Sequence, residues 1–239
     1  VTSTPGLIVG QESNEITANL TADSSVASSV DVWLKITMKR TDPSGSIDTS
    51  DCIIQRMNTS GGYDNVSLNT DTDAGTGTIT GYLDGGVLST LTPGGTVSAT
   101  FKLKFNKPGH YYYQVNAYHR DASGNLVVLP NTSAGSSIVV KDVIESVTAN
   151  PTEPEAGQPF TVTAITNVAG NIDFSYGAQY GTVSASPRAD GTYYANIQFT
   201  ADNTVSVTDA ITATLFDTTG ILATKKADLT LAAPATYHT

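Results

Sequence analysis

Short runs in which apolar and polar residues alternate recur along the chain. The clearest runs cover residues 30–39, 101–105 and 160–164. A period of two with one polar face is typical of antiparallel strands that bury a single face. No segment has the 3.6-residue period of an amphipathic helix. The sequence therefore predicts an all-β fold without a long α-helix.

Turn residues separate these runs and indicate where one domain ends. The apolar strand at 137–141 closes one set of strands, and the strand at 144–149 opens the next. Almost no Gly or Ser linker separates them, so we expect a semi-rigid junction. The predicted parts are an N-terminal arm at 1–10, a β-sandwich domain with long loops at 11–142, an immunoglobulin-like domain at 143–233 and a C-terminal tail at 234–239.

The second predicted domain has the strand count of an immunoglobulin-like sandwich. Seven candidate strands lie near 144–149, 159–165, 171–176, 180–185, 192–199, 205–215 and 221–231. Seven short strands in a domain of this length are typical of that architecture. The first domain adds two polar insertions, at 41–51 and 58–75, that we expect to be surface loops. The predicted fold is two tandem antiparallel immunoglobulin-like β-sandwich domains.

A related phrase occurs once in each predicted domain. Pro108 and Gly109 precede Tyr111 in the first, and Asp190-Gly191 precedes a Tyr pair at 193–194 in the second. A turn directly before a Tyr-bearing strand is the pattern of a tyrosine corner, in which the phenol bonds to an upstream backbone group.

Two segments resemble known bacterial domains. Residues 146–151 and 155–164 resemble the opening of bacterial immunoglobulin-like repeats. Such repeats occur in surface-layer proteins, invasin-type adhesins and large secreted enzymes. Residues 91–101, followed by 108–111, are similar to bacterial adhesion-related domains. The resemblance implies a sandwich fold at the cell surface and implies no single function.

Composition and charge narrow the class of protein. Ser and Thr number 58 of the 239 residues, while charged residues make up only 14%. This balance is typical of secreted or surface proteins, and the first residue, Val1, fits removal of a signal peptide. Net charge is −10 without a basic stripe, which argues against nucleic acid. No apolar run reaches the length of a membrane span.

Cys52 is the single cysteine, so the chain cannot form an internal disulfide. It stands at the start of a predicted strand. The simplest interpretation is a small buried apolar side chain. A nucleophile or an intermolecular disulfide is the alternative.

Asn69, Asp71 and Asp73 alternate as the first ligands of a calcium loop do. Ala74 replaces the expected glycine and Thr80 the expected bidentate glutamate. A solvated polar loop is the alternative, so no cofactor is required and calcium remains a candidate.

Tyrosines could also form a ligand face. Tyr112 and Tyr118 share the polar side of one predicted strand, where they could stack on sugars or simply cover the sheet. Four sequons, at Asn19, Asn58, Asn65 and Asn131, are candidate glycosylation sites. Their number does not exceed chance.

Two apolar features are candidate interfaces. Trp33 lies among charged residues on the polar side of its strand, so we expect a partner subunit, the other domain or a loop to cover it. Leu7, Ile8 and Val9 form an apolar run in the arm. This run could pair with its own sheet or add to the open edge of a neighbouring molecule.

These features favour a structural or adhesive protein of the cell surface, such as a subunit of a surface layer, a filament or an adhesin stalk that self-associates. The alternative is a carbohydrate-binding module of a larger secreted protein, with a polysaccharide as partner. None of the common catalytic motifs occurs, so we do not expect an enzyme.

Overall fold

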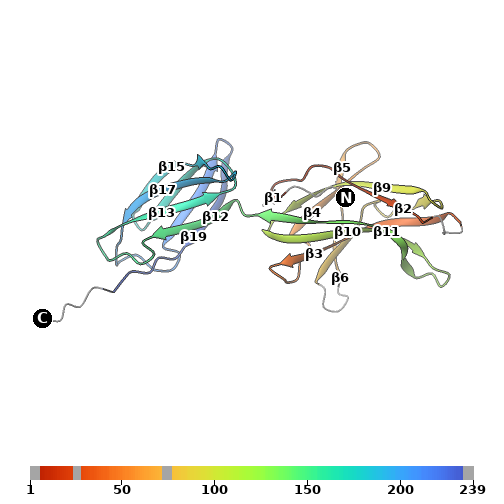
Figure 1. The fold of residues 1–239 in the computed structure, drawn as a ribbon, viewed down its shortest axis with the longest axis horizontal. Coiled ribbons are helices and arrows are strands. Elements are labelled where there is room, and N and C mark those ends of the chain that lie inside the picture. The colour runs from red at the N-terminus through yellow and green to blue at the C-terminus, as the bar shows by residue number, and fades with distance from the viewer. Residues whose placement is uncertain (1–5, 24–27, 72–76, 234–239) are drawn as a thin grey trace. The chain divides into compact units, whose positions relative to one another are not determined.

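A computed structural model describes residues 6–23, 28–71 and 77–233, and every regular element within them is a β-strand (Figure 1). The all-β prediction is confirmed. The chain divides into two compact units, Val1–Lys141 and Asp142–Thr239. Each unit has its own sheets. No helix in the described part of the chain has the length and apolar character needed to span a membrane.

The strands of the first unit are β1 (Leu7–Ile8), β2 (Ile16–Thr21), β3 (Val30–Asp42), β4 (Cys52–Met57), β5 (Tyr63–Asn65), β6 (Asn69–Asp71), β7 (Thr78–Tyr82), β8 (Ser89–Leu91), β9 (Thr96–Phe105), β10 (Gly109–Arg120) and β11 (Leu126–Lys141). Those of the second unit are β12 (Ile144–Asn150), β13 (Pro159–Thr166), β14 (Asn171–Tyr176), β15 (Gln179–Ser184), β16 (Ser186–Pro187), β17 (Tyr193–Thr200), β18 (Ile211–Asp217) and β19 (Gly220–Ala227).

The first unit contains two sheets. One is seven-stranded, in the order β1-β11-β10-β3-β7-β6 with β8 paired to β3, and the other has the order β2-β9-β4-β5. All pairs are antiparallel except β1 with β11, which is parallel. The prediction of antiparallel sheets is thus confirmed with one exception. Because β1 is the N-terminal strand and β11 ends the unit, no tight turn has to connect them.

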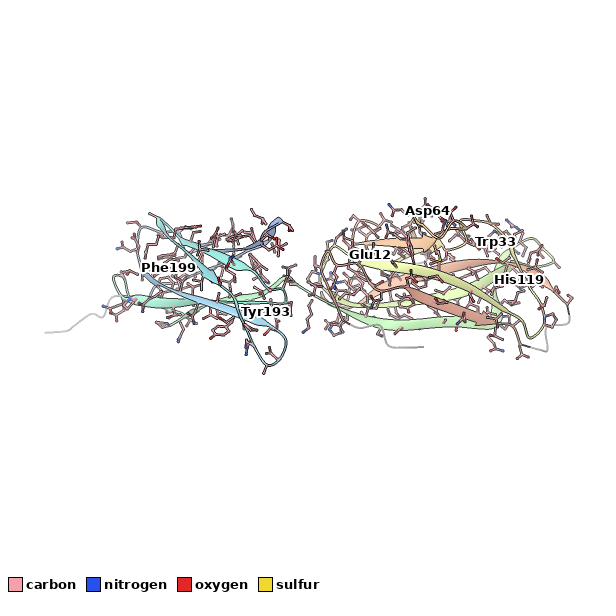
Figure 2. The ribbon with its side chains drawn as sticks, turned by 90° about the horizontal axis from the view of Figure 1, so that it is seen from above. Glu12, Trp33, Asp64, His119, Tyr193 and Phe199 are labelled. Atoms are coloured by element: carbon pink, nitrogen blue, oxygen red, sulfur yellow. The ribbon has the colours of Figure 1, made fainter. Side chains whose placement is uncertain are left out.

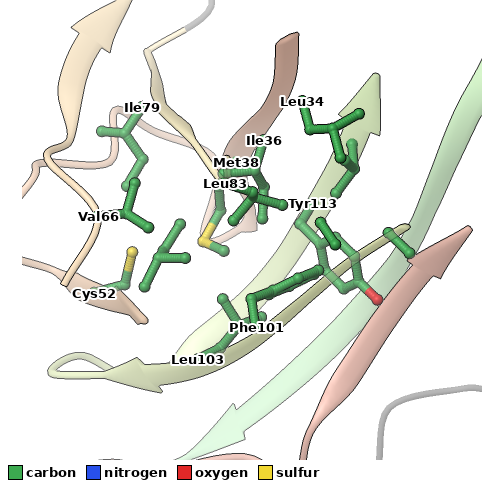
Figure 3. Close-up of a cluster of buried hydrophobic side chains, with 14 of the residues drawn as sticks. Leu34, Ile36, Met38, Cys52, Val66, Ile79, Leu83, Phe101, Leu103 and Tyr113 are labelled. Carbon is green, nitrogen blue, oxygen red and sulfur yellow. The ribbon is translucent and has the colours of Figure 1, made fainter. Parts of the chain in front are cut away.

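A shared core holds these two sheets together. Alternate residues of β3 are fully buried, and so are the facing residues of β9 (Figure 3). The ring of Phe101 on β9 meets Tyr113 on β10 edge to face, with centroids 5.6 Å apart. Phe105 and Tyr111 pack at 4.4 Å. Aromatic contacts of this kind add to the burial energy and fix how the two sheets face each other.

The second unit also has two sheets, in the orders β12-β13-β17-β16 and β15-β14-β18-β19. Phe160 of β13 contacts Tyr176 of β14 at 5.1 Å, so rings from both sheets meet in one core. Five of the seven predicted strands are confirmed within one residue at each end, and the strand predicted at 221–231 ends earlier, at Ala227. The predicted strand at 205–215 begins only at Ile211. Asp209 has a φ of 52°, a left-handed conformation that interrupts the extended chain there.

The two long insertions of the first unit are not purely surface loops. Ile47 is fully buried and Val66 is 9% exposed. The second insertion also contains β5 and β6. Isolated apolar residues in a polar segment gave no periodic signal, which is why the sequence did not place them in the core.

One of the two predicted tyrosine corners is present. The Tyr111 hydroxyl donates to the Lys107 carbonyl oxygen at 3.0 Å. In the second unit, no hydrogen bond of the Tyr193 or Tyr194 phenol is found among the described residues. The buried phenol there is Tyr176, which donates to the carbonyl of Asp202 and accepts from its N–H, both at 3.1 Å.

The residues between β11 and β12 are bonded into the second unit. The Asn167 N–H donates to the Val143 carbonyl at 2.9 Å, and the Asn167 side chain donates to the Asp142 carbonyl at 2.8 Å. Lys225 Nζ lies 3.1 Å from Asp142 Oδ2 and also donates to the Ile144 carbonyl at 3.0 Å.

Candidate functional site

The outer face of the seven-stranded sheet gathers the aromatic residues that the core does not use. Residues 32, 34, 36 and 38 of β3 point into the core, so Trp33 and Lys35 point outward. Register places Tyr118 opposite Trp33 and Tyr112 opposite Lys39. Tyr82 of β7 stands opposite Lys35. The aromatic–cation face is defined here as Trp33, Lys35, Lys39, Tyr112, Tyr118 and Arg120.

A cation lies over three of these rings. Lys35 Nζ is 5.3 Å from the Tyr118 centroid, and Lys39 Nζ is 5.6 Å from that of Tyr112. The Arg120 guanidinium is 5.4 Å from the Trp33 ring. Such contacts are attractive because the ring face carries negative charge. Each cation keeps N–H groups that can donate to an additional partner.

Trp33 is half-buried, at the end of the first unit that also carries His119 (Figure 2). We expected a partner, the other domain or a loop to cover it. In the structure the Arg120 guanidinium contacts the Trp33 ring, and Arg120 is two residues beyond Tyr118, the register partner of Trp33 on the neighbouring strand. A contact between strands far apart in sequence leaves no local signal, and for this reason the sequence did not identify it.

A small charged cluster adjoins Tyr118. Lys35 Nζ lies 4.0 Å from Asp71 Oδ2. Burial, then the charge of Asp71 and the neighbouring Tyr82, raises the pKa of Tyr118, so the phenol is protonated at neutral pH. It can therefore donate a hydrogen bond to a ligand.

Two of the three calcium candidates lie on this same sheet, and Asp73 lies outside the described residues. Asn69 and Asp71 are the ends of β6, on one face and two residues apart. Side chains at such positions run parallel at about 7 Å separation rather than converging on one ion. Lys35 also places positive charge beside Asp71. Among the described residues, no group of three or more His, Cys, Asp or Glu side chains could hold a metal.

The N-terminal arm is paired inside its own unit. Leu7 is 5% exposed and opposes Val140 of β11, and the Val9 N–H donates to the Lys141 carbonyl at 2.9 Å. Ile8 and Val9 are half-buried. Of the two fates predicted for the apolar run, the structure contains the pairing with its own sheet.

The four sequons differ in environment. Asn19 is exposed on β2, where it accepts a hydrogen bond from Ser98 at 2.7 Å, and Asn65 ends β5 rather than lying in a loop. Asn58 is half-buried, and its Oδ1 accepts two backbone N–H groups of its own turn. Asn131 is exposed with a φ of 59°. Asn19, Asn65 and Asn131 are thus exposed, whereas Asn58 is half-buried.

Cys52 is 1% exposed, as expected for a small apolar core residue (Figure 3). Burial, then the charge of Asp51, raises the pKa of its thiol to about 12. A shallow surface depression of about 200 Å³ is lined by Cys52 and by Thr49, Ile53, Asn65, Val66 and Leu68. The thiol at its base is protonated and is therefore a poor nucleophile.

The sequence did not identify the buried carboxylate next to Cys52. Asp51 is 2% exposed, and Lys107 Nζ contacts its Oδ1 at 2.6 Å as an ion pair without good hydrogen-bond geometry. Burial tends to raise the pKa of Asp51, but the N–H of Asp48 and the ammonium of Lys107 outweigh it and the pKa is lowered. An Asp before a strand carries no signal that it is buried.

Charge is divided unequally between the two units. The first contains nine Lys and Arg against twelve Asp and Glu, a net charge of −3. The second contains three against ten, a net charge of −7. The second unit therefore accounts for most of the negative charge.

No family model matches the chain. No curated protein matches it either. Three similar solved structures are distant in sequence. A structure described as AvmM, which catalyses macrocyclization in alchivemycin A biosynthesis, is 17% identical with a TM-score of 0.41, covering 58% of this chain and 85% of that one.

Two further structures cover nearly the whole chain. BspA_C_WT is 8% identical with a TM-score of 0.33, and 96% of each chain is covered. Red sea bream transglutaminase is 9% identical with a TM-score of 0.30; 95% of this chain matches 29% of that enzyme. The likeness is to β-rich proteins in general and assigns no family.

Proposed function

We propose that this chain is an extracellular structural or adhesive surface protein that self-associates as a subunit of a surface layer, a filament or an adhesin stalk. The observation that carries the proposal is the aromatic–cation face. Trp and Tyr side chains outside the core, set among a few polar groups, are typical of surfaces that bind another protein. This face crosses the two central strands β3 and β10.

Uncharged polar ladders on the other sheet of the first unit support an extracellular location. Thr17 and Thr100 hydroxyls pair across β2 and β9 at 3.1 Å, and Thr21 and Thr96 at 2.9 Å. Cross-strand hydroxyl pairs stabilise a wet sheet face without charged side chains. The low content of Lys and Glu fits such a surface.

We further propose that both units are immunoglobulin-like sandwiches. The second unit supports this most directly. Its sheet orders, β12-β13-β17 against β15-β14-β18-β19, follow the strand arrangement of that architecture, and rings of β13 and β14 meet between them.

The test is the assembly state of the purified full chain. Size-exclusion chromatography over a range of concentrations, with electron microscopy of the same samples, should reveal oligomers, filaments or sheets. A chain that stays monomeric at every concentration tested would rule out the structural proposal.

Carbohydrate binding is the second candidate, and the half-buried, outward-facing phenols of the face favour it. The cations over Tyr112 and Tyr118 occupy part of the ring surface that a sugar would stack on. We would take retention on polysaccharide resins as support for this function if Tyr112→Ala abolishes it and Tyr180→Ala keeps it. Tyr180 is the control because it does not belong to the aromatic–cation face. Equal retention of both variants would count against it.

A further inference from the structure

We propose that the aromatic–cation face of one molecule binds the acidic end of the second unit of another copy, so that copies join head to tail. The proposal deepens the proposed function and rests on it, since it names the surface and the partner through which the chain would assemble.

The cations of the face have few ion-pair partners of their own. Lys35 approaches Asp71 only at 4.0 Å. No carboxylate of the described residues lies within ion-pair distance of Lys39 or Arg120; Arg120 donates instead to the Gly124 carbonyl. Lys39 is exposed. The face thus offers positive charge beside apolar rings, and a partner with carboxylates would complete it.

The complementary surface is at the end of the second unit where β12 finishes. The acidic end is defined as the exposed residues Glu153, Glu155, Asp202, Asp209 and Asp228. Strand pairing brings their loops together. Pro159 opposes Thr200, and Ile211 opposes Ala227, so the three loops that carry these residues emerge at one end.

Little positive charge neutralises this end. Asp209 pairs with Lys226 at 3.3 Å. Among the described residues, Glu153 and Glu155 have no basic side chain within ion-pair distance. Five carboxylates against one ammonium leave the end strongly negative, in a unit whose net charge is −7.

A contact between two different surfaces has a specific consequence. Each molecule carries one copy of each surface, so the contact can repeat from molecule to molecule as a ring or an open filament. A contact between identical surfaces would stop at a dimer. The proposal therefore predicts the behaviour of mixtures as well as of single variants.

The experiment uses the full chain in sedimentation velocity. Lys35→Glu with Lys39→Glu reverses the net charge of the face, and Glu153→Lys with Glu155→Lys removes the net negative charge of the end. Lys104→Glu is the control for charge inversion as such, because it replaces one Lys by Glu on the outer face of the other sheet. Circular dichroism verifies that all variants are folded.

We expect the wild-type chain to associate more strongly at about 0.02 M than at about 0.5 M salt, since screening weakens the contact. Each of the two double variants alone should associate at least about tenfold more weakly than the wild type. Mixed together, the two variants should associate again, because the intact end of one can bind the intact face of the other. Lys104→Glu should associate like the wild type.

Two results would overturn the proposal and leave the assembly function standing. One is assembly that Lys35→Glu with Lys39→Glu does not weaken; the other is a variant mixture that stays monomeric. A wild-type chain that never associates would instead remove the proposed function itself. Loss of retention on an acidic polysaccharide resin in the face variant, with assembly unchanged, would assign the face to carbohydrate and reject the second copy as its occupant.

Discussion

At the residue scale, a single turn device recurs in the second unit. Asp190, Asp202 and Asp217 each accept hydrogen bonds from both the backbone N–H and the hydroxyl of the Thr two positions later. The bonds satisfy backbone donors that the turn leaves open. Bonding to the Thr lowers the pKa of each carboxyl. The sequence indicated the turn at Asp190-Gly191, although not these bonds.

Asp51 should make stability depend on acidity. Its lowered pKa means that its contribution is present above the ordinary value of 3.8 and is lost as the pH falls through the folded-state value. Asp51→Asn should lower the free energy of unfolding by about 1–3 kcal/mol at neutral pH. The difference in unfolding free energy between Asp51→Asn and the wild type should shrink as the pH falls through the folded-state pKa of Asp51. Urea titrations at several pH values measure it; a constant difference would contradict the assignment.

Cys52 should be chemically silent in the folded protein. Burial and a pKa of about 12 keep the thiol protonated and out of reach of reagents. We expect an aromatic disulfide reagent to leave native protein unmodified over hours and to react fully once urea unfolds it. Rapid reaction of the native protein would mean that β4 opens readily.

At the element scale, the sequence predicted strands well wherever one face is buried. The alternation in β3 and β13 comes directly from that burial. The sequence could not predict which strands pair or what lies over an outward side chain, since pairing depends on distant segments. That limit explains why the sequence placed Tyr112 and Tyr118 on one side of a strand but did not bring Trp33 beside them.

The tyrosine corner before β10 should contribute measurably. Tyr111→Phe removes the bond to the Lys107 carbonyl and should cost about 1 kcal/mol in unfolding free energy. Tyr193→Phe is the matched control and should change stability by less than about 0.5 kcal/mol. Denaturant unfolding of the two variants compares them. Equal effects of the two substitutions would show that the hydrogen bond of Tyr111 does not stabilise the fold.

The arm belongs to the first unit's core, and substitutions should reflect this. Leu7→Ala should lower the unfolding free energy by about 2 kcal/mol, because its side chain is buried against β11. Ile8→Ala, on the half-buried side of the same strand, should cost less. If Leu7→Ala instead abolished assembly without affecting stability, the arm would be an intermolecular connector.

At the scale of the whole molecule, the charge distribution sets two opposing effects of salt. A net charge of −10 makes copies repel one another, and salt weakens that repulsion. The head-to-tail contact works the other way, since salt weakens its attraction. Only a surface that concentrates cations can give net attraction at low salt. The sequence supplied the total charge and, through the boundary predicted near residue 143, nearly its division; the structure gives −3 and −7 for the two units.

The parallel pairing of β1 with β11 also determines how the first unit bears load. β1 is the first strand of the unit and β11 is the last, and they run in the same direction. Tension applied at the two chain ends of the unit pulls these neighbours past each other lengthwise. Two hydrogen bonds then bear the load together: the Val9 N–H to the Lys141 carbonyl, and the Gly10 N–H to the Phe105 carbonyl. They are not broken one after another. Such a shear clamp resists force better than a hairpin that unzips from one end.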